Sequence, residues 1–223
     1  MNLKENGYCI IKNAVSLDVC RILAKEFELL ETSAFAFNLP KGYGSAAPEY
    51  ATYDFPYNDH QVRNSFAWYS PLAFEALSDT IVKEHVENLL GEEVYPTYTY
   101  GRIYYNNAEM KIHKDRVASD FAVSCCLSVD ELSKPWPLGF IDKLGNRVLI
   151  EQTPGDIVIY QGDQLEHWRD QYSGQKQIQC FLFYVTANGP RAELKYDTRP
   201  SLGLPSTFRR IGNDAQDGQF IQK

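Results

Sequence analysis

Apolar residues recur at helical spacing in two stretches of the N-terminal part of the chain. The first stretch follows Ser16, whose hydroxyl can cap a helix. The second begins at Ser70-Pro71, where the proline is compatible with a first helical turn, and it ends at Gly91. We therefore predict two amphipathic helices, preceded by a short β-like run at 8–11. The apolar positions of the first helix are Val19, Ile22, Leu23, Phe27 and Leu30.

The segment between these helices, residues 33–69, is dense in aromatic residues, glycine, proline and asparagine and has no steady period. Long irregular segments in compact domains are usually functional or disordered, and this aromatic content argues against disorder. A lid over a substrate site and a packed structural loop are both consistent with it. Its aromatic residues include Tyr50, Tyr53, Phe55, Tyr57, Phe66, Trp68 and Tyr69.

From Tyr95 onward the pattern changes to short runs rich in β-branched and aromatic residues, separated by turn signals such as Pro154-Gly155. The runs are 95–105, 121–129, 147–151, 156–160 and 177–185. Many short strands after two helices predict a mainly β fold with flanking helices: a double-stranded β-helix, or jelly-roll, barrel of the cupin-like type, buttressed by its N-terminal helices.

A length of 223 residues suits one domain with a substantial core. We expect residues 1–94 to supply the helices and the aromatic loop, and residues 95–186 to form the barrel. Residues 187–223 lack periodicity and are expected to be a C-terminal extension that wraps the barrel or stays mobile. We predict no internal repeat.

The formal net charge of −7 argues against a nucleic-acid partner, because phosphate backbones are bound by basic surfaces. No apolar run approaches the roughly 20 residues of a membrane helix, and residues 1–6 lack the apolar stretch of a signal peptide. We therefore expect a soluble, cytoplasmic protein. The five cysteines show no CxxC spacing and are expected to be core thiols.

Candidate chemistry begins with Ile112-His113-Lys114-Asp115, an H-x-D pair that carries little weight alone. On an extended strand, residues i and i+2 share a face, so His113 and Asp115 can reach one metal ion. His167 follows a β run and can supply a third ligand. Two histidines and one carboxylate leave coordination positions open, an arrangement suited to Fe(II) that also binds O₂ and a co-substrate.

The other two histidines have weaker settings. His85 and Glu87 lie two apart on a predicted helix, where such residues do not face one another, and His60 lies in the irregular segment. On the strand before His113, alternate residues share one face and suggest an anion pocket. A barrel interior filled by tyrosines is an equally good interpretation for Tyr98 and Tyr100, but a weaker one for Tyr104. The residues on this face are Tyr98, Tyr100, Arg102 and Tyr104.

From Tyr95 to about Tyr184 the sequence resembles the Fe(II)/2-oxoglutarate-dependent dioxygenases, particularly their prolyl-hydroxylase-like branch. The resemblance rests on the run from Tyr104 to Asp115, on Pro154-Gly155-Asp156, on His167 and on Lys176. It implies that His113, Asp115 and His167 bind iron. It also implies that Tyr104, nine residues before the first histidine, helps to bind 2-oxoglutarate, and that Lys176, nine residues after the second, pairs with the distal carboxylate.

The sequence departs from the family at this anchor. Lys176 replaces the commoner arginine, giving a point charge in place of a bidentate fork, and Ile178 stands where serine or threonine is often found. Arg169 is a competing carboxylate anchor, although the family offset favours Lys176. The N-terminal third and the tail match no particular substrate.

The resemblance implies hydroxylation of a C–H bond with 2-oxoglutarate and O₂ as co-substrates, releasing succinate and CO₂. Asp115 argues against halogenation, because related halogenases lack this carboxylate. The substrate is expected to be an amino acid, a peptidyl residue such as proline, or a small metabolite. The alternative is a non-redox cupin-like barrel that binds a metal or ligand, and nucleic-acid demethylation fits poorly with the charge. The sequence does not indicate an oligomeric state.

Overall fold

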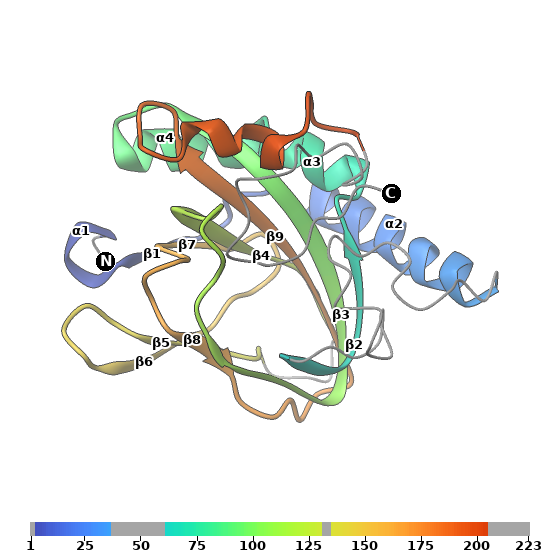
Figure 1. The fold of residues 1–223 in the computed structure, drawn as a ribbon. Coiled ribbons are helices and arrows are strands. Elements are labelled where there is room, and N and C mark those ends of the chain that lie inside the picture. The colour runs from blue at the N-terminus through green and yellow to red at the C-terminus, as the bar shows by residue number, and fades with distance from the viewer. Residues whose placement is uncertain (1–2, 37–60, 131–134, 205–223) are drawn as a thin grey trace.

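In a computed structural model, residues 3–36, 61–130 and 135–204 are described. Their strands form one strongly curled antiparallel sheet in the order β1-β7-β4-β9-β3-β8-β5-β6, with β2 paired to β3 (Figure 1). This confirms the predicted mainly β architecture. The strands are β1 (Tyr8–Ile11), β2 (Val62–Tyr69), β3 (Val94–His113), β4 (Phe121–Val129), β5 (Leu138–Ile141), β6 (Arg147–Ile150), β7 (Ile157–Tyr160), β8 (His167–Arg169) and β9 (Lys176–Thr186).

The long strand β3 belongs to both halves of the curled sheet. Residues 94–105 pair with β9, whereas Met110 and His113 pair with β8. Between these two parts, Asn107 has a φ of 65°, a left-handed conformation that asparagine tolerates better than most residues. The bend lets one strand pass from the half with β9 and β4 to the half with β8, β5 and β6, which lies at the lower left of Figure 1.

The helices are α1 (Leu3–Asn6), α2 (Leu17–Ala36), α3 (Leu72–Ser78) and α4 (Ile81–Leu90), and a 3₁₀ helix, η2 (Ala192–Thr198), follows β9. The predicted first helix is confirmed as α2, and the Val19 amide donates to the Ser16 hydroxyl. The predicted second helix ends at Gly91 as expected but is two helices, because the chain breaks after Ser78. There the Ser78 and Thr80 hydroxyls donate to backbone carbonyls and compete with helical hydrogen bonds.

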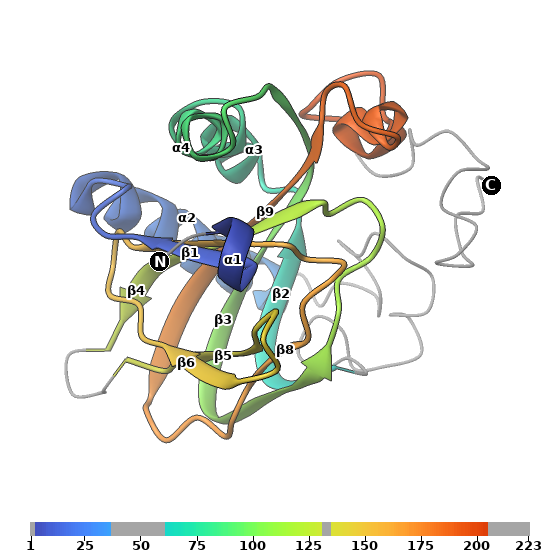
Figure 2. The ribbon, with the colours of Figure 1, turned by 90° about the vertical axis from the view of Figure 1, so that its left-hand side faces the viewer.

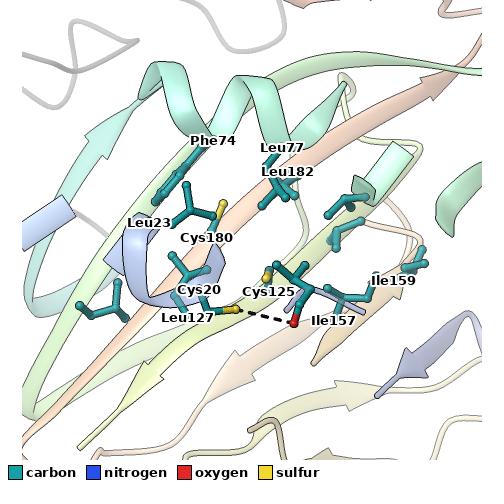
Figure 3. Close-up of a cluster of buried hydrophobic side chains, with 14 of the residues drawn as sticks. Cys20, Leu23, Phe74, Leu77, Cys125, Leu127, Ile157, Ile159, Cys180 and Leu182 are labelled. Carbon is teal, nitrogen blue, oxygen red and sulfur yellow. Dashed lines mark hydrogen bonds between the residues drawn. The ribbon is translucent and has the colours of Figure 1, made fainter. Parts of the chain in front are cut away.

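Helices α2, α3 and α4 pack on the outer face of the sheet and form one hydrophobic core with it (Figures 1 and 3). Phe27 of α2 and Phe74 of α3 stack with ring centroids 5.4 Å apart. Burying such a side chain contributes about 1.5–3 kcal/mol. Four cysteines lie in the same core: Cys9, and Cys20, Cys125 and Cys180, which are labelled in Figure 3. All five cysteines are buried, unpaired thiols, which confirms that sequence prediction.

Strand β2 shows that the predicted irregular segment of residues 33–69 is too long. Residues 33–36 end α2, and Val62–Tyr69 pair with β3. A register shift between Arg63 and Ser65, with Asn64 at a φ of 53°, removes the alternation that would have identified this strand. Residues 37–60, with His60, lie outside the described residues, so neither interpretation of the loop is tested.

The C-terminal extension packs on the sheet through η2, and residues 205–223 lie outside the described part. In Figure 2, η2 lies near the upper ends of β3 and β9, on the same side as α3 and α4. None of the helices described in the structure has the length and apolar character needed to cross a membrane.

Candidate metal centre

The structure brings His113, Asp115 and His167 together at the junction of β3 and β8. His113 and His167 are directly opposed in the antiparallel pair, and their ring centroids are 4.3 Å apart. Asp115 follows the end of β3, and its Oδ1 lies 3.7 Å from Nε2 of His167 and 4.0 Å from Nε2 of His113. One ligand atom from each residue fits within 4.8 Å of the others, so the three can hold one metal ion.

Backbone carbonyls orient both imidazole rings. Nδ1 of His113 lies 2.8 Å from the Lys111 carbonyl oxygen, and Nδ1 of His167 lies 3.1 Å from that of Leu165. Because a carbonyl only accepts, each Nδ1 carries the proton and each Nε2 presents a lone pair toward Asp115. Burial lowers the pKa of both histidines to about 4, so both are neutral at pH 7 and able to bind a metal.

Asp115, the third candidate ligand, needs a positively charged partner. Burial raises the pKa of Asp115 to about 6, and its Oδ2 has no hydrogen-bond partner among the described residues. A buried carboxylate oxygen without a donor is costly unless a cation binds it. Two neutral imidazoles and this carboxylate therefore fit a divalent cation, and the donor set is the one that non-haem Fe(II) oxygenases use.

Beside this centre, Arg169 is a buried cation surrounded by neutral groups. It lies two residues after His167 on β8, so both side chains share the inner face of the strand. Its Nη1 donates to the Trp136 carbonyl, and its Nη2 lies 3.3 Å from Oε1 of Gln152. Among the described residues no carboxylate lies within ion-pair distance of Arg169. Burial lowers the pKa of Arg169, which reflects the cost of this charge and favours an anionic ligand.

Two glutamines of β9 add buried donors next to Arg169. Oε1 of Gln177 accepts from the Trp136 amide, and Oε1 of Gln179 accepts from Ser124, whose hydroxyl also lies 3.5 Å from Nη2 of Arg169. Nε2 of both glutamines is buried without a hydrogen-bond partner among the residues described. The interior of the barrel therefore holds a cluster of donors, Arg169, Gln177 and Gln179, suited to a carboxylate.

No family model and no curated protein matches the sequence. Three solved structures illustrate its similarity in fold. AviO1 from Streptomyces viridochromogenes Tue57 is 16% identical with a TM-score of 0.65, covering 85% of this chain and 94% of its own. A Pseudomonas putida prolyl-4-hydroxylase is 13% identical with a TM-score of 0.59, covering 82% and 94%. HygX from Streptomyces hygroscopicus, with nickel and 2-oxoglutarate bound, is 10% identical with a TM-score of 0.57, covering 82% and 84%.

The chain has the fold of the Fe(II)/2-oxoglutarate oxygenases. The predicted jelly-roll barrel is confirmed by this likeness, as is the resemblance to the prolyl-hydroxylase-like branch at the level of the fold. The candidate ligands lie at the strand ends of this barrel, and Arg169, Gln177 and Gln179 lie within it.

In this oxygenase fold Lys176 does not point into the barrel, contrary to the sequence expectation. Its Nζ lies 2.5 Å from Oε1 of Glu28 on α2, and the side chain is 40% exposed. In the register of β3 and β9, Lys176 lies opposite Tyr105. The Tyr105 side chain also points toward α2, where its hydroxyl donates to Glu31. Because side chains alternate along β9, the inward positions are Gln177 and Gln179, one residue away from the expected one.

The remaining candidates lie on the inner face of β3, as predicted. Arg102 is buried, its Nη1 donates to the Ser65 hydroxyl at 2.9 Å, and its charge contributes to the lowered pKa of His113. Tyr104 is fully buried with its ring edge-on to Trp136 at 5.0 Å. Tyr98 and Tyr100 stack on Phe183 and Phe181, with centroids 4.1 and 4.7 Å apart. These two tyrosines therefore fill the barrel interior.

Sequence reasoning missed two residues that contact the candidate metal ligands. The Tyr160 ring lies 4.9 Å from that of His167, and its hydroxyl lowers the pKa of Asp115. The Gly162 carbonyl accepts from the Asp115 amide at 2.9 Å. Alternation along β7 places Tyr160 inward, but the sequence carries no signal for Gly162. His85 lies elsewhere, on α4 against the Ala14 carbonyl.

Gly162 offers a test of the ligand geometry. A Cβ at this position would lie 2.6 Å from Oδ2 of Asp115 and 3.0 Å from the Ala122 Cβ. We expect Gly162→Ala to displace the Asp115 carboxylate and lower metal affinity at least about tenfold, as changes next to metal ligands typically do. Anaerobic Fe(II) titration against a chromogenic chelator measures this.

Gly145→Ala is the matched control for that change. Gly145 has a φ of 83°, and no described atom lies within 4 Å of the position that a Cβ would take, so alanine strains a surface turn without touching the site. The control should lose stability and keep its metal affinity. Wild-type affinity in Gly162→Ala would show that the Asp115 carboxylate is not held where the structure places it.

Proposed function

We propose that this protein is an Fe(II)- and 2-oxoglutarate-dependent dioxygenase. His113, Asp115 and His167 would hold the metal, and Arg169 with Gln177 and Gln179 would bind the distal carboxylate of 2-oxoglutarate. The observation that carries the proposal is the meeting of an open three-ligand centre with a buried arginine that lacks a carboxylate partner in the described structure. A metal-binding barrel without redox chemistry does not require a buried arginine of this kind.

The chain's own residues would supply geometry and electrostatics. The Nε2 atoms and the Asp115 carboxylate would hold the metal, while the buried donors around Arg169 would orient the co-substrate. When bound, iron and 2-oxoglutarate supply the oxidising chemistry: one atom of O₂ enters the substrate C–H bond and the other enters succinate, with release of CO₂. The closely packed aromatic interior, including Tyr98 and Phe183, would exclude water.

Tyr104 and Arg102 support this arrangement from β3. The Tyr104 hydroxyl is near enough to Arg169 to offset part of the lowering of its pKa by burial, so both side chains lie in the same part of the barrel interior. Arg102 lies near enough to His113 to lower its pKa, between the metal centre and the tyrosines. We assign Tyr104 to the distal carboxylate and Arg102 to the side of the co-substrate nearer the metal.

For the substrate we propose hydroxylation of an amino acid, a peptidyl residue such as proline, or a small metabolite. The likeness to a prolyl-4-hydroxylase supports the peptidyl candidate. The likeness to HygX means that the fold is not confined to prolyl-4-hydroxylases. The formal net charge of −7 argues against a nucleic-acid substrate. Screening peptides and metabolites for stimulated 2-oxoglutarate turnover would distinguish these classes.

The decisive experiment adds Fe(II) and then 2-oxoglutarate to the metal-free protein without oxygen. We expect a weak visible charge-transfer band only when both are present, followed on admission of O₂ by one succinate for each 2-oxoglutarate consumed. Fe(II) binding without the band, and without succinate, would instead support the non-redox cupin-like barrel. Failure to bind Fe(II) at all would refute the proposed dioxygenase.

A further inference from the structure

The C-terminal extension contains an unusual backbone turn. Three successive residues of η2 that are not glycine, Tyr196, Asp197 and Thr198, have φ values of 55°, 58° and 62°. Left-handed backbone is unfavourable for such residues, so a run of three persists only where the surroundings hold it. This strained turn lies next to the candidate site and positions side chains there.

Arg199 fixes this turn to the body of the protein. Its Nη2 lies 2.6 Å from Oε1 of Glu75 on α3, and both side chains are almost completely buried. The same guanidinium donates to the carbonyls of Thr97 and Leu204, at 3.2 and 2.6 Å. The turn is therefore anchored to α3 and β3, at the end of the sheet where η2 is seen in Figure 2.

The turn delivers Asp197 to Arg116. Oδ1 of Asp197 lies 2.8 Å from Nη2 of Arg116, and both side chains are largely buried. The Arg116 guanidinium lies over the Tyr98 ring, 3.8 Å from its centroid, and Tyr98 stacks in turn on Phe183. Arg116 is thus held between a carboxylate and an aromatic ring, two partners that suit a guanidinium.

Arg116 directly follows the metal ligand Asp115 in the chain. Oδ2 of Asp115 is buried without a hydrogen-bond partner among the described residues. A guanidinium released from Asp197 would find this carboxylate next to it. Arginine and carboxylate form bidentate pairs, which would use the oxygens that a metal ion requires.

We propose that Asp197 is a positioning residue for the metal centre: it holds Arg116 over Tyr98 and so keeps the Asp115 carboxylate available to the metal. This inference rests on the proposed function in taking the metal to be Fe(II). It gives the C-terminal extension a part in the site, although none of its described residues is a candidate ligand. Asp197 acts only through Arg116, so its effect must disappear when Arg116 is removed.

The test compares Fe(II) affinity, measured without oxygen by competition with a chromogenic chelator, in four proteins. Asp197→Asn removes the charge but keeps the left-handed turn, which asparagine tolerates. We expect its affinity to fall about 10- to 100-fold. Arg116→Gln alone, and Arg116→Gln combined with Asp197→Asn, should both bind Fe(II) as the wild type does. Rescue by the second substitution separates positioning from a structural role.

Thermal unfolding separates affinity from stability. Asp197→Asn and the double variant both lack the ion pair and should unfold at similarly reduced temperatures, so recovered affinity cannot come from recovered stability. Asp120→Asn is the matched control, because it removes the aspartate of another local ion pair, Asp120 with Arg191. Its Fe(II) affinity should equal that of the wild type.

Wild-type affinity in Asp197→Asn overturns the inference, and so does weakened binding that persists in the double variant. If Asp197→Asn does not fold, Arg116→Gln decides alone, and a tenfold loss of Fe(II) affinity in that variant refutes the proposal. A wild-type protein that binds no Fe(II) refutes the proposed function and this inference together. Binding by the wild type with equal binding by Asp197→Asn refutes this inference only.

Discussion

Alanine at His113, Asp115 or His167 is expected to abolish 2-oxoglutarate turnover and the binding of Fe(II), while the protein stays folded. Each substitution removes one of three ligands from a centre whose members lie within 4.8 Å of one another. Stability should suffer least in Asp115→Ala, because burial raises the pKa of Asp115 to about 6. A carboxyl whose pKa is raised by folding destabilises the metal-free folded state above its unfolded pKa, and alanine removes that cost at pH 7.

Metal-dependent thermal stabilisation provides the measurement. A ligand that binds only the folded state at 100 times its Kd adds about 2.7 kcal/mol to the free energy of unfolding. Saturating Fe(II) should raise the unfolding temperature of the wild type and leave that of the three variants unchanged. His85→Ala is the control, since His85 lies on α4 against the Ala14 carbonyl, away from the site. A ligand variant with wild-type stabilisation and turnover would remove that residue from the assignment.

Arg169→Met is expected to weaken 2-oxoglutarate binding by roughly two to three orders of magnitude. Without its guanidinium, the distal carboxylate would be buried next to neutral groups, and breaking a buried ion pair typically costs about 3–5 kcal/mol. Methionine keeps much of the side-chain volume. In the absence of 2-oxoglutarate the variant should be no less stable than the wild type, because a buried charge without a carboxylate partner in the described structure is replaced by an apolar group.

Lys176→Met is the matched comparison, since it also replaces a long basic side chain with methionine. Lys176 pairs with Glu28 on the outer face, so its loss should leave the 2-oxoglutarate Kd unchanged. Both constants can be measured by titrating the anaerobic Fe(II) protein and following the visible band. The reverse result, with Lys176→Met weak and Arg169→Met normal, would return the anchor to the position that the family spacing predicts.

The helices and most of the strands could be predicted because their apolar residues follow one period over enough positions. The interval from Leu17 to Ala36 is long enough for a helical pattern to be clear, and Gly91 marks a helix end by its left-handed φ. Strand β2 was missed because the bulge at Asn64 interrupts its alternation. The break after Ser78 depends on local hydroxyl hydrogen bonds, which periodicity does not detect.

The site was predictable where its residues are close in sequence and less so where they meet by folding. The spacing of His113 and Asp115 follows from strand geometry alone, and the chain folds so that His167 faces them across β3 and β8. The predicted orientation of Lys176 was wrong, because an error of one residue along a strand moves a side chain to the opposite face of the sheet. Arg169 could not be chosen over Lys176, because β8 has three residues and gives no pattern to align.

Strand β8 carries both a candidate metal ligand and the proposed carboxylate anchor. Residues two apart on a strand are separated by about 6.4–6.8 Å of backbone, so one extended stretch sets the distance between His167 and Arg169. The stretch is paired with β3 on one side and β5 on the other. On the proposed function, the chain would select a keto acid by its length through this fixed interval, and motion elsewhere in the protein would change entry to the site without changing that selection.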